Sequence, residues 1–255
     1  MSGPIDEETL RLAVRCLDLT NLDEDCAEAD VTALAARATT PAGTVAALCV
    51  WPRFVTAARA AAPPDVRIAT VVAFPTGEES DEESIDLARE AVRDGADEID
   101  VVIPWRAMKE GLTEAVASRV QRVRRAGAGA PVKAILETGV LDGPEEVRRA
   151  AELAIAGGAD FVKTSTGKTP VGATLAAADA MLEAIAAAER PVGFKASGGI
   201  RTASEAAAYL DLARDRMGAD WVTPARFRFG ASSLLDALLS ALAGEDAGTP
   251  EEEGY

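Results

Sequence analysis

Two lysines interrupt apolar segments of this sequence, and their surroundings indicate chemistry more clearly than those of any other residue. Lys163 lies in DFVKTSTGK and Lys195 in VGFKASGG, where the flanking residues are typical of buried strands. Burial and a second ammonium group nearby both disfavour the charged form of a lysine, which leaves a neutral and nucleophilic amine. Such an amine can form a Schiff base with an aldehyde or a ketone. The alternative, a lysine that caps a strand or pairs with a carboxylate, is weaker for two such lysines than for one.

Acidic residues occupy comparable positions in other apolar runs. Asp100 lies in DEIDVVIP, and the alternation of side chains along a strand places Glu98 on the same side as Asp100. A carboxylate beside two lysines can hold one of them as an ammonium ion and relay protons through water. It can also be a buried ion-pair partner, and the two roles are compatible. Three further residues at strand ends are expected either to belong to the same network or to react: Asp18 in CLDLT, Lys133 in VKAILE and Glu137.

Glycine-containing loops follow three of the predicted strands and indicate an anion site. Backbone N–H groups can approach a phosphate closely where glycine leaves room, and a helix N-terminus adds a favourable dipole. In (β/α)8 barrels, the loops after strands seven and eight commonly bind phosphate. The residues expected to bind substrate here are Asp18, Thr166, Gly167, Lys168, Gly198, Gly199, Arg201, Gly230, Ser232 and Ser233.

Composition excludes several classes of function. The chain has 255 residues with 26 basic and 42 acidic side chains, a formal charge of −16, and no histidine. The absence of histidine excludes Ser-His-Asp and Cys-His triads and metal sites built on imidazole, so proton transfer depends on lysine, carboxylates, tyrosine or water. An acidic chain without a basic cluster argues against nucleic acid and anionic membrane as partners. Its apolar runs are too short to span a bilayer, and three cysteines without CxxC spacing indicate reduced thiols, so a cytoplasmic protein is expected.

The elements that must position these residues alternate along the chain. Short β-rich runs are each followed by a longer run rich in alanine, glutamate and arginine, and this alternation predicts a parallel sheet. Strands are predicted at 16–19, 46–50, 67–73, 98–103, 132–136, 160–164, 192–196 and 220–222. Helices are predicted at 24–38, 52–62, 81–94, 111–127, 144–157, 174–189, 202–216 and 231–243, with an extra one at 6–15. The predicted fold class is therefore α/β, a single (β/α)8 TIM barrel preceded by an extra N-terminal helix.

Local signals support these boundaries. Asp81, Asp142 and Thr202, the last with Glu205 three positions later, are predicted helix caps. The triplet Gly-Ala-Asp, in which glycine is expected to end a helix before a strand begins, recurs at 95–97, 158–160 and 218–220. Such recurrence is typical of a barrel built from repeated strand and helix units.

The chain is predicted to form one catalytic domain, residues 1–243, because no low-complexity linker interrupts residues 6–243. Residues 244–255 differ in composition: they contain five acidic residues and no basic ones, together with glycine and proline. This composition predicts a flexible acidic tail, which ends in Tyr255.

At these residues the sequence resembles the deoxyribose-phosphate aldolase family. The similarity covers most of the chain in one order, from CLDLTNL through LCVWPRF, RIATVVAFP, GADEIDVVIPWRA, VKAILETG, GADFVKTSTGK, VGFKASGGIRT and GADW to RFGASSLL. The resemblance implies a class I aldolase, without metal or cofactor, that reversibly cleaves 2-deoxy-D-ribose 5-phosphate into acetaldehyde and D-glyceraldehyde 3-phosphate. It implies Lys163 as the Schiff-base lysine, Lys195 as the second lysine and Asp100 as the proton-relay aspartate. The glycine-containing loops correspond to the phosphate-binding loops of the family.

The resemblance also bears on the tail and on cellular role. In some members a C-terminal tyrosine exchanges a proton with the enamine intermediate, which would make Tyr255 catalytic; otherwise Tyr255 is a solvated terminus. Cys49 in LCVWP matches a cysteine of bacterial members and is expected to be a small buried hydrophobe. The implied partners are small phosphosugars and aldehydes, with a homo-oligomer left open, and the implied pathway is deoxyribonucleotide catabolism.

Two other functions remain open from the sequence alone. Another lysine-dependent aldolase or transaldolase would keep Lys163 but act on a different phosphorylated sugar. A non-catalytic phosphosugar-binding barrel is the alternative from a different class, and it would need neither Lys163 nor Lys195. Trapping with borohydride and acetaldehyde separates all three, because it labels only a protein that forms an imine with acetaldehyde.

Overall fold

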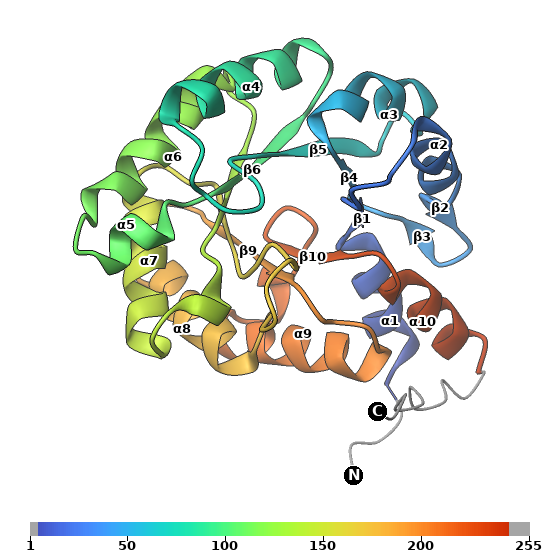
Figure 1. Ribbon diagram of the computed structural model, residues 1–255. Helices are drawn as coiled ribbons and strands as arrows, with labels where there is room; N and C mark the ends of the chain where they lie inside the picture. Colours follow the sequence, from blue (N-terminus) through green and yellow to red (C-terminus); the bar gives the residue numbers. More distant parts are fainter. Residues whose placement is uncertain (1–4, 245–255) are drawn as a thin grey trace, which may run out of the picture.

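The computed structural model describes residues 5–244 as a closed barrel of parallel strands surrounded by helices (Figure 1). Within these residues eight strands close the barrel in the order β1, β10, β9, β8, β7, β6, β5, β4, so that β1 pairs with both β10 and β4. They are β1 Leu17–Asn21, β4 Ala47–Val50, β5 Arg67–Val72, β6 Glu98–Val102, β7 Val132–Ile135, β8 Phe161–Lys163, β9 Gly193–Ser197 and β10 Phe227–Ala231. The predicted (β/α)8 barrel is confirmed.

Helices cover the outside of the barrel, and the predicted extra N-terminal helix, α1, packs against α9 and α10 (Figure 1). The helices of the described residues are α1 Glu7–Arg15, α2 Glu28–Ala36, α3 Val55–Ala61, α4 Asp81–Arg93, α5 Trp105–Lys109, α6 Glu114–Ala126, α7 Pro144–Ala156, α8 Leu175–Ala186, α9 Ala203–Met217 and α10 Leu234–Leu242. Short 3-10 turns lie at η1 Pro52–Phe54, η2 Thr138–Val140 and η3 Ala219–Trp221.

The strands are buried on both faces, which is why their sequences are nearly continuous apolar runs. Along each strand, side chains that point into the barrel alternate with side chains that point outward to the helices. The outward-pointing residues, such as Ile68, Val101 and Phe194, are wholly buried. Alanines dominate the inner helix faces, and Ala150 and Ala154 of α7 are also wholly buried. Small side chains let the helices lie close to the strands, so the barrel is held rigidly around its interior.

The prediction of a strand at 220–222 is wrong. Gly218, with φ of 93°, ends α9, and its triplet leads into the turn η3 instead of a strand. Asp220 is exposed, whereas a strand of this barrel must be buried on both faces. The strand that closes the barrel is β10, where Phe227 and Phe229 are wholly buried. The other two Gly-Ala-Asp triplets do lead directly into β6 and β8.

Smaller differences concern helix ends. The capping box at Thr202 is confirmed. The cap of α4 is Ser80, so Asp81 is its first helical residue and not its cap. Gly143 precedes α7 and provides no side-chain cap, so the prediction that Asp142 caps this helix is also wrong. The short helix α5 and a two-stranded antiparallel sheet, β2 Thr39–Thr40 with β3 Gly43–Thr44, were not among the expected elements.

Candidate active site

Strand register builds a charged interior inside the barrel. Lys163 of β8 lies opposite Lys195 of β9, and Asp100 of β6 lies opposite Lys133 of β7. Residues opposite one another on adjacent parallel strands point to the same face of the sheet. In this barrel that face is the inner one, so these four side chains point toward the barrel axis. Glu98 precedes Asp100 by two positions and lies on the same side, where both contact Lys133.

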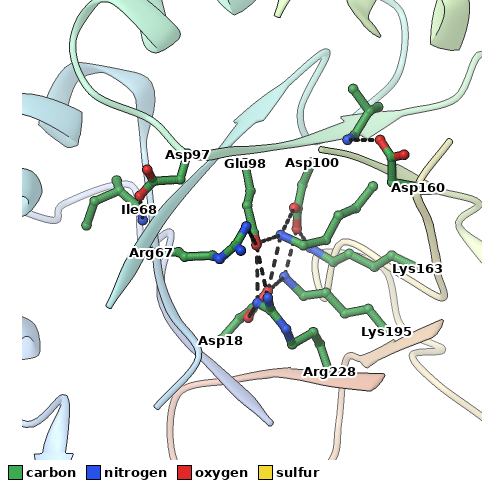
Figure 2. Close-up of polar contacts among 12 residues, drawn as sticks. Asp18, Arg67, Ile68, Asp97, Glu98, Asp100, Asp160, Lys163, Lys195 and Arg228 are labelled. Atoms are coloured by element: carbon green, nitrogen blue, oxygen red, sulfur yellow. Dashed lines mark hydrogen bonds and ion pairs between the residues drawn. The ribbon is translucent and has the colours of Figure 1, made fainter. Parts of the chain in front are cut away.

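Asp100 is the centre of this interior because three lysines donate to it (Figure 2). Lys163 Nζ lies 2.9 Å and Lys195 Nζ 2.8 Å from the same oxygen, Asp100 Oδ2. Lys133 Nζ lies 2.8 Å from the other oxygen, Oδ1. All four side chains are at most 2% exposed. The structure thus brings together the two lysines and the aspartate that the sequence singled out.

Figure 2 also shows Asp18, Glu98 and Arg228 linked to this centre. Glu98 is the first residue of β6, and Asp18 and Arg228 are the second residues of β1 and β10, so this second cluster lies near the amino ends of the strands. Asp18 of β1 lies 2.6 Å from Lys195 Nζ and also contacts Arg228 of β10. Arg228 Nη2 lies 2.9 Å from Glu98 Oε1, and Lys133 Nζ lies 2.6 Å from Glu98 Oε2. Sequence reasoning missed Arg228, because its segment was not predicted to be a strand. The alternation Phe-Arg-Phe before GASS is the signal that could have found it.

The pKa values of the two central lysines are shifted in opposite directions. Burial disfavours the charged form of Lys163 and lowers its pKa despite Asp100, and the positive charge of Lys195 lowers it further. Burial also opposes the charge of Lys195, yet Asp100 and Asp18 outweigh burial and raise the pKa of Lys195. The expectation that burial and a nearby ammonium group lower the pKa of such a lysine is therefore wrong for Lys195. The charges around the two lysines therefore favour a neutral amine at Lys163 and an ammonium ion at Lys195.

The three lysines around Asp100 keep its carboxyl group ionised. Burial alone would raise its pKa, but Lys133, Lys163 and Lys195 hold the pKa of Asp100 well below its usual range. A carboxylate that accepts from all three lysines fixes their nitrogen atoms in place. It can also pass a proton between a bound water and Lys163 or Lys195.

A polar cavity of about 210 Å³ opens at the carboxyl ends of β1, β8, β9 and β10. Asp18 lies outside its lining and is wholly buried in the ion-pair network. Asn21 and Asp23, which the sequence did not single out, are also part of the lining. All the other residues expected to bind substrate line this cavity: Thr166, Gly167, Lys168, Gly198, Gly199, Arg201, Gly230, Ser232 and Ser233.

Glycine is required by geometry at several of these positions. Gly198 and Gly199 have φ of 98° and 85°, values that favour glycine. A Cβ at Gly172 would lie 2.3 Å from the backbone oxygen of Gly198, so the two loops approach this closely only with glycine at position 172. A Cβ at Gly230 would lie 2.9 Å from Lys195 Cε. The bare backbone at Gly230 therefore leaves room for the lysine that contacts Asp100.

Glu137 has a positioning role for the cavity. Its φ of 55° is left-handed, and its side chain is buried. It accepts hydrogen bonds from the backbone N–H and hydroxyl of Thr166 and from Thr169 Oγ1. Glu137 therefore fixes the loop that carries Gly167 and Lys168 and contacts none of the interior lysines.

Cys49 is wholly buried, as expected of a small hydrophobe, and burial raises the pKa of its thiol. Tyr255 and the rest of the acidic tail from residue 245 lie outside the described residues. Among residues 5–244 no group of three or more acidic or cysteine side chains is arranged to hold a metal ion.

A parallel (β/α)8 barrel with buried lysines and an aspartate in its interior, and a polar cavity at the carboxyl ends of its strands, is typical of a lysine-dependent barrel enzyme. Comparison with known proteins identifies the kind. The model of the DeoC/LacD family of aldolases matches residues 12–240, and the chain belongs to this family.

Individual relatives agree with this assignment. The chain is 52% identical over 241 residues to the deoxyribose-phosphate aldolase of Agrobacterium fabrum, covering 93% of each protein. The solved structure of QR15, an aldolase, superposes with a TM-score of 0.78 at 30% identity, over 91% of this chain and 96% of that one. The deoxyribose phosphate aldolase of Aeropyrum pernix, described as a unique tetrameric structure, gives a TM-score of 0.72 at 28% identity over 91% of both chains.

Proposed function

We propose that this protein is a class I aldolase that reversibly cleaves 2-deoxy-D-ribose 5-phosphate into acetaldehyde and D-glyceraldehyde 3-phosphate. The observation that carries the proposal is the contact of buried Lys163 and Lys195 with the same oxygen of Asp100, at 2.9 and 2.8 Å. In this setting the pKa of Lys163 is lowered, whereas the pKa values of Lys195 and Lys133 are raised. The relative from Agrobacterium fabrum, a deoxyribose-phosphate aldolase at 52% identity, supports the choice of substrate.

The geometry supports a complete sequence of steps. Neutral Lys163 Nζ attacks C1 of the open-chain sugar, and Lys195 donates the proton with which the C1 hydroxyl leaves as water. In the resulting iminium ion, Asp100 accepts the proton of the 3-hydroxyl through a water molecule. The C2–C3 bond then breaks, its electron pair moves toward the iminium nitrogen, and C3 becomes the aldehyde of glyceraldehyde 3-phosphate. Protonation of the remaining enamine at C2 and hydrolysis of the imine release acetaldehyde and neutral Lys163.

Borohydride trapping tests the proposal directly. Incubation with acetaldehyde and borohydride should add an N-ethyl group to Lys163 and inactivate the enzyme, and peptide mass spectrometry locates the group. An adduct on Lys195 would reverse the assigned roles. An enzyme that is trapped only by other carbonyl donors would be a different lysine-dependent aldolase, and a protein that is never trapped would be a binding barrel.

The cavity is proposed to hold the substrate phosphate, and Gly199 allows a matched test of that role. A Cβ at this position meets no atom within 4 Å, so a side chain fits sterically. Gly199→Asp should raise KM for deoxyribose 5-phosphate about tenfold or more above Gly199→Asn, because only the carboxylate repels a phosphate. The two variants share the strain of a positive φ. Gly199→Asp and Gly199→Asn should have similar KM values for unphosphorylated deoxyribose. If their KM values differ as much for that sugar as for deoxyribose 5-phosphate, the phosphate does not bind at Gly199.

Tyr255 is proposed to exchange a proton with the enamine carbon, a role that the sequence alone suggests. Tyr255→Phe should slow the exchange of acetaldehyde methyl protons with deuterium oxide, while imine trapping stays close to the parent level. Proton NMR of acetaldehyde measures the exchange. If Tyr255→Phe exchanges like the parent, a water held by Asp100 and Lys195 must protonate the enamine.

The proposed setting is the cytoplasm, with a role in deoxyribonucleotide catabolism and a homo-oligomeric assembly. The relative from Aeropyrum pernix, described as tetrameric, supports the assembly. No helix within residues 5–244 has the length and hydropathy needed to cross a membrane. Light scattering of the purified protein measures its assembly.

A further inference from the structure

The ion-paired side chains inside the barrel form one connected network in which bases outnumber acids (Figure 2). Three carboxylates face four basic groups, and the members are Asp18, Glu98, Asp100, Lys133, Lys163, Lys195 and Arg228. Each of these residues is at most 3% exposed. Arg67 Nη1 also lies 3.2 Å from Glu98, but its side chain is 52% exposed, so water screens its charge.

An unbalanced charge is costly in an interior of low dielectric constant, so one base of the network should be neutral. Arg228 keeps its proton, because a guanidinium group does not lose one in proteins. Lys133 Nζ lies within 3.3 Å of all three carboxylates, and Lys195 Nζ within 2.8 Å of two. Among the acidic residues within 5–244, Lys163 contacts Asp100 alone, on the oxygen that also accepts from Lys195. Lys163 is therefore the base that the network leaves uncharged.

We propose that Arg228 and Glu98 are positioning residues that set the protonation state of Lys163 without touching it or the substrate. Arg228 contacts Asp18 and Glu98, and it reaches Lys163 only through Lys195 or Lys133 and Asp100. Without Arg228, three carboxylates face two fixed positive charges, and Lys163 gains a proton. Without Glu98, two carboxylates face three fixed positive charges, and protonation of Lys163 becomes less favourable. The inference rests on the proposed role of Lys163 as nucleophile and adds the remote groups that keep it reactive.

Other titratable groups on the strands around Lys163 leave this balance unchanged. The Cys49 thiol of β4 is wholly buried, and burial raises its pKa, so it stays uncharged. Glu137 at the end of β7 is bound by Thr166 and Thr169 and contacts no base of the network.

The test is the pH dependence of Lys163 labelling in the full-length protein. Formaldehyde with cyanoborohydride methylates neutral amines, so the labelling rate of the Lys163 peptide rises with a midpoint at the pKa of Lys163. Arg228→Met should raise this midpoint by roughly one pH unit, and Glu98→Gln should lower it. The double variant restores the balance with two acids and two fixed bases, so its midpoint should return to the parent value. Lys109, a partly exposed lysine outside the network, is the internal reference.

A merely structural role predicts a different pattern, in which stability falls in each variant and the midpoints coincide. Equal midpoints, shifts in one direction, or a double variant unlike the parent would overturn the proposal. If Arg228→Met does not fold, Arg228→Lys should keep the parent midpoint and Glu98→Gln should still lower it. Labelling needs no sugar, so opposed shifts in a protein that leaves deoxyribose 5-phosphate intact would reject the proposed substrate and support the network.

Discussion

Lys163→Met should reduce cleavage of deoxyribose 5-phosphate by about a thousandfold or more and leave the barrel as stable as the parent. Methionine has nearly the length of lysine but no nitrogen, so no imine can form. It also leaves three carboxylates facing three fixed positive charges in the interior. Acetaldehyde release measures the activity, and thermal unfolding measures the stability.

Lys163→Arg supplies the contrast. It should be equally inactive, because a guanidinium group is never a neutral nucleophile. It should also be less stable than Lys163→Met, because it adds a fourth fixed positive charge to a buried interior. Lys109→Met, outside the site, should keep both activity and stability. Substantial activity in Lys163→Met would remove Lys163 from the mechanism and leave Lys195 as the nucleophile to test.

Lys195→Leu should lose about a hundredfold of the rate at neutral pH and recover part of it as pH rises. Lys195 is an ammonium ion whose charge lowers the pKa of Lys163. Its removal raises the pKa of Lys163, so a higher pH is needed to produce the neutral amine. The acid limb of the pH–rate profile should therefore move upward by roughly one unit.

The maximal rate of Lys195→Leu at high pH tests whether Lys195 also donates a proton. Lys195→Leu should stay slower than the parent even at high pH, because the proton donor for the departing hydroxyl is also lost. Arg228→Met changes only the charge balance. Its rate of Lys163 methylation by formaldehyde and cyanoborohydride should therefore reach the parent rate once the pH is high enough. A slow Lys195→Leu enzyme with an unchanged pH profile would show that Lys195 acts by proton donation alone.

The residues at the centre of the site were predictable from the sequence because they violate local composition. Lys163, Lys195 and Asp100 are charged side chains within apolar strands, and strand alternation orients each of them toward the barrel axis. The same reasoning failed at Arg228. The Gly-Ala-Asp triplet at 218–220 suggested a strand, and only the pairing of β10 with β9 and β1 shows which segment closes the barrel.

The residues of the cavity were predictable from the sequence, but the depth of Asp18 in the barrel was not. Glycine-containing loops are visible in the sequence, and the residues predicted from them do line one cavity. Asp18 was grouped with them, yet it lies below the cavity as a partner of Lys195 and Arg228. Depth inside a barrel depends on where each strand begins relative to its neighbours, and sequence patterns do not reveal that register.

By itself, the sequence determined the alternation of strands and helices, the residue types available for proton transfer, and the lysines that face the interior. Those features follow from side-chain periodicity and composition, which are local properties of the chain. Only the tertiary structure shows the charges that lower the pKa of Lys163 and raise the pKa of Lys195. Lys195 lies within 2.8 Å of two carboxylates from two different strands, whereas Lys163 reaches one. The protonation of each lysine depends on charges that are distant in sequence and adjacent only when the barrel is closed.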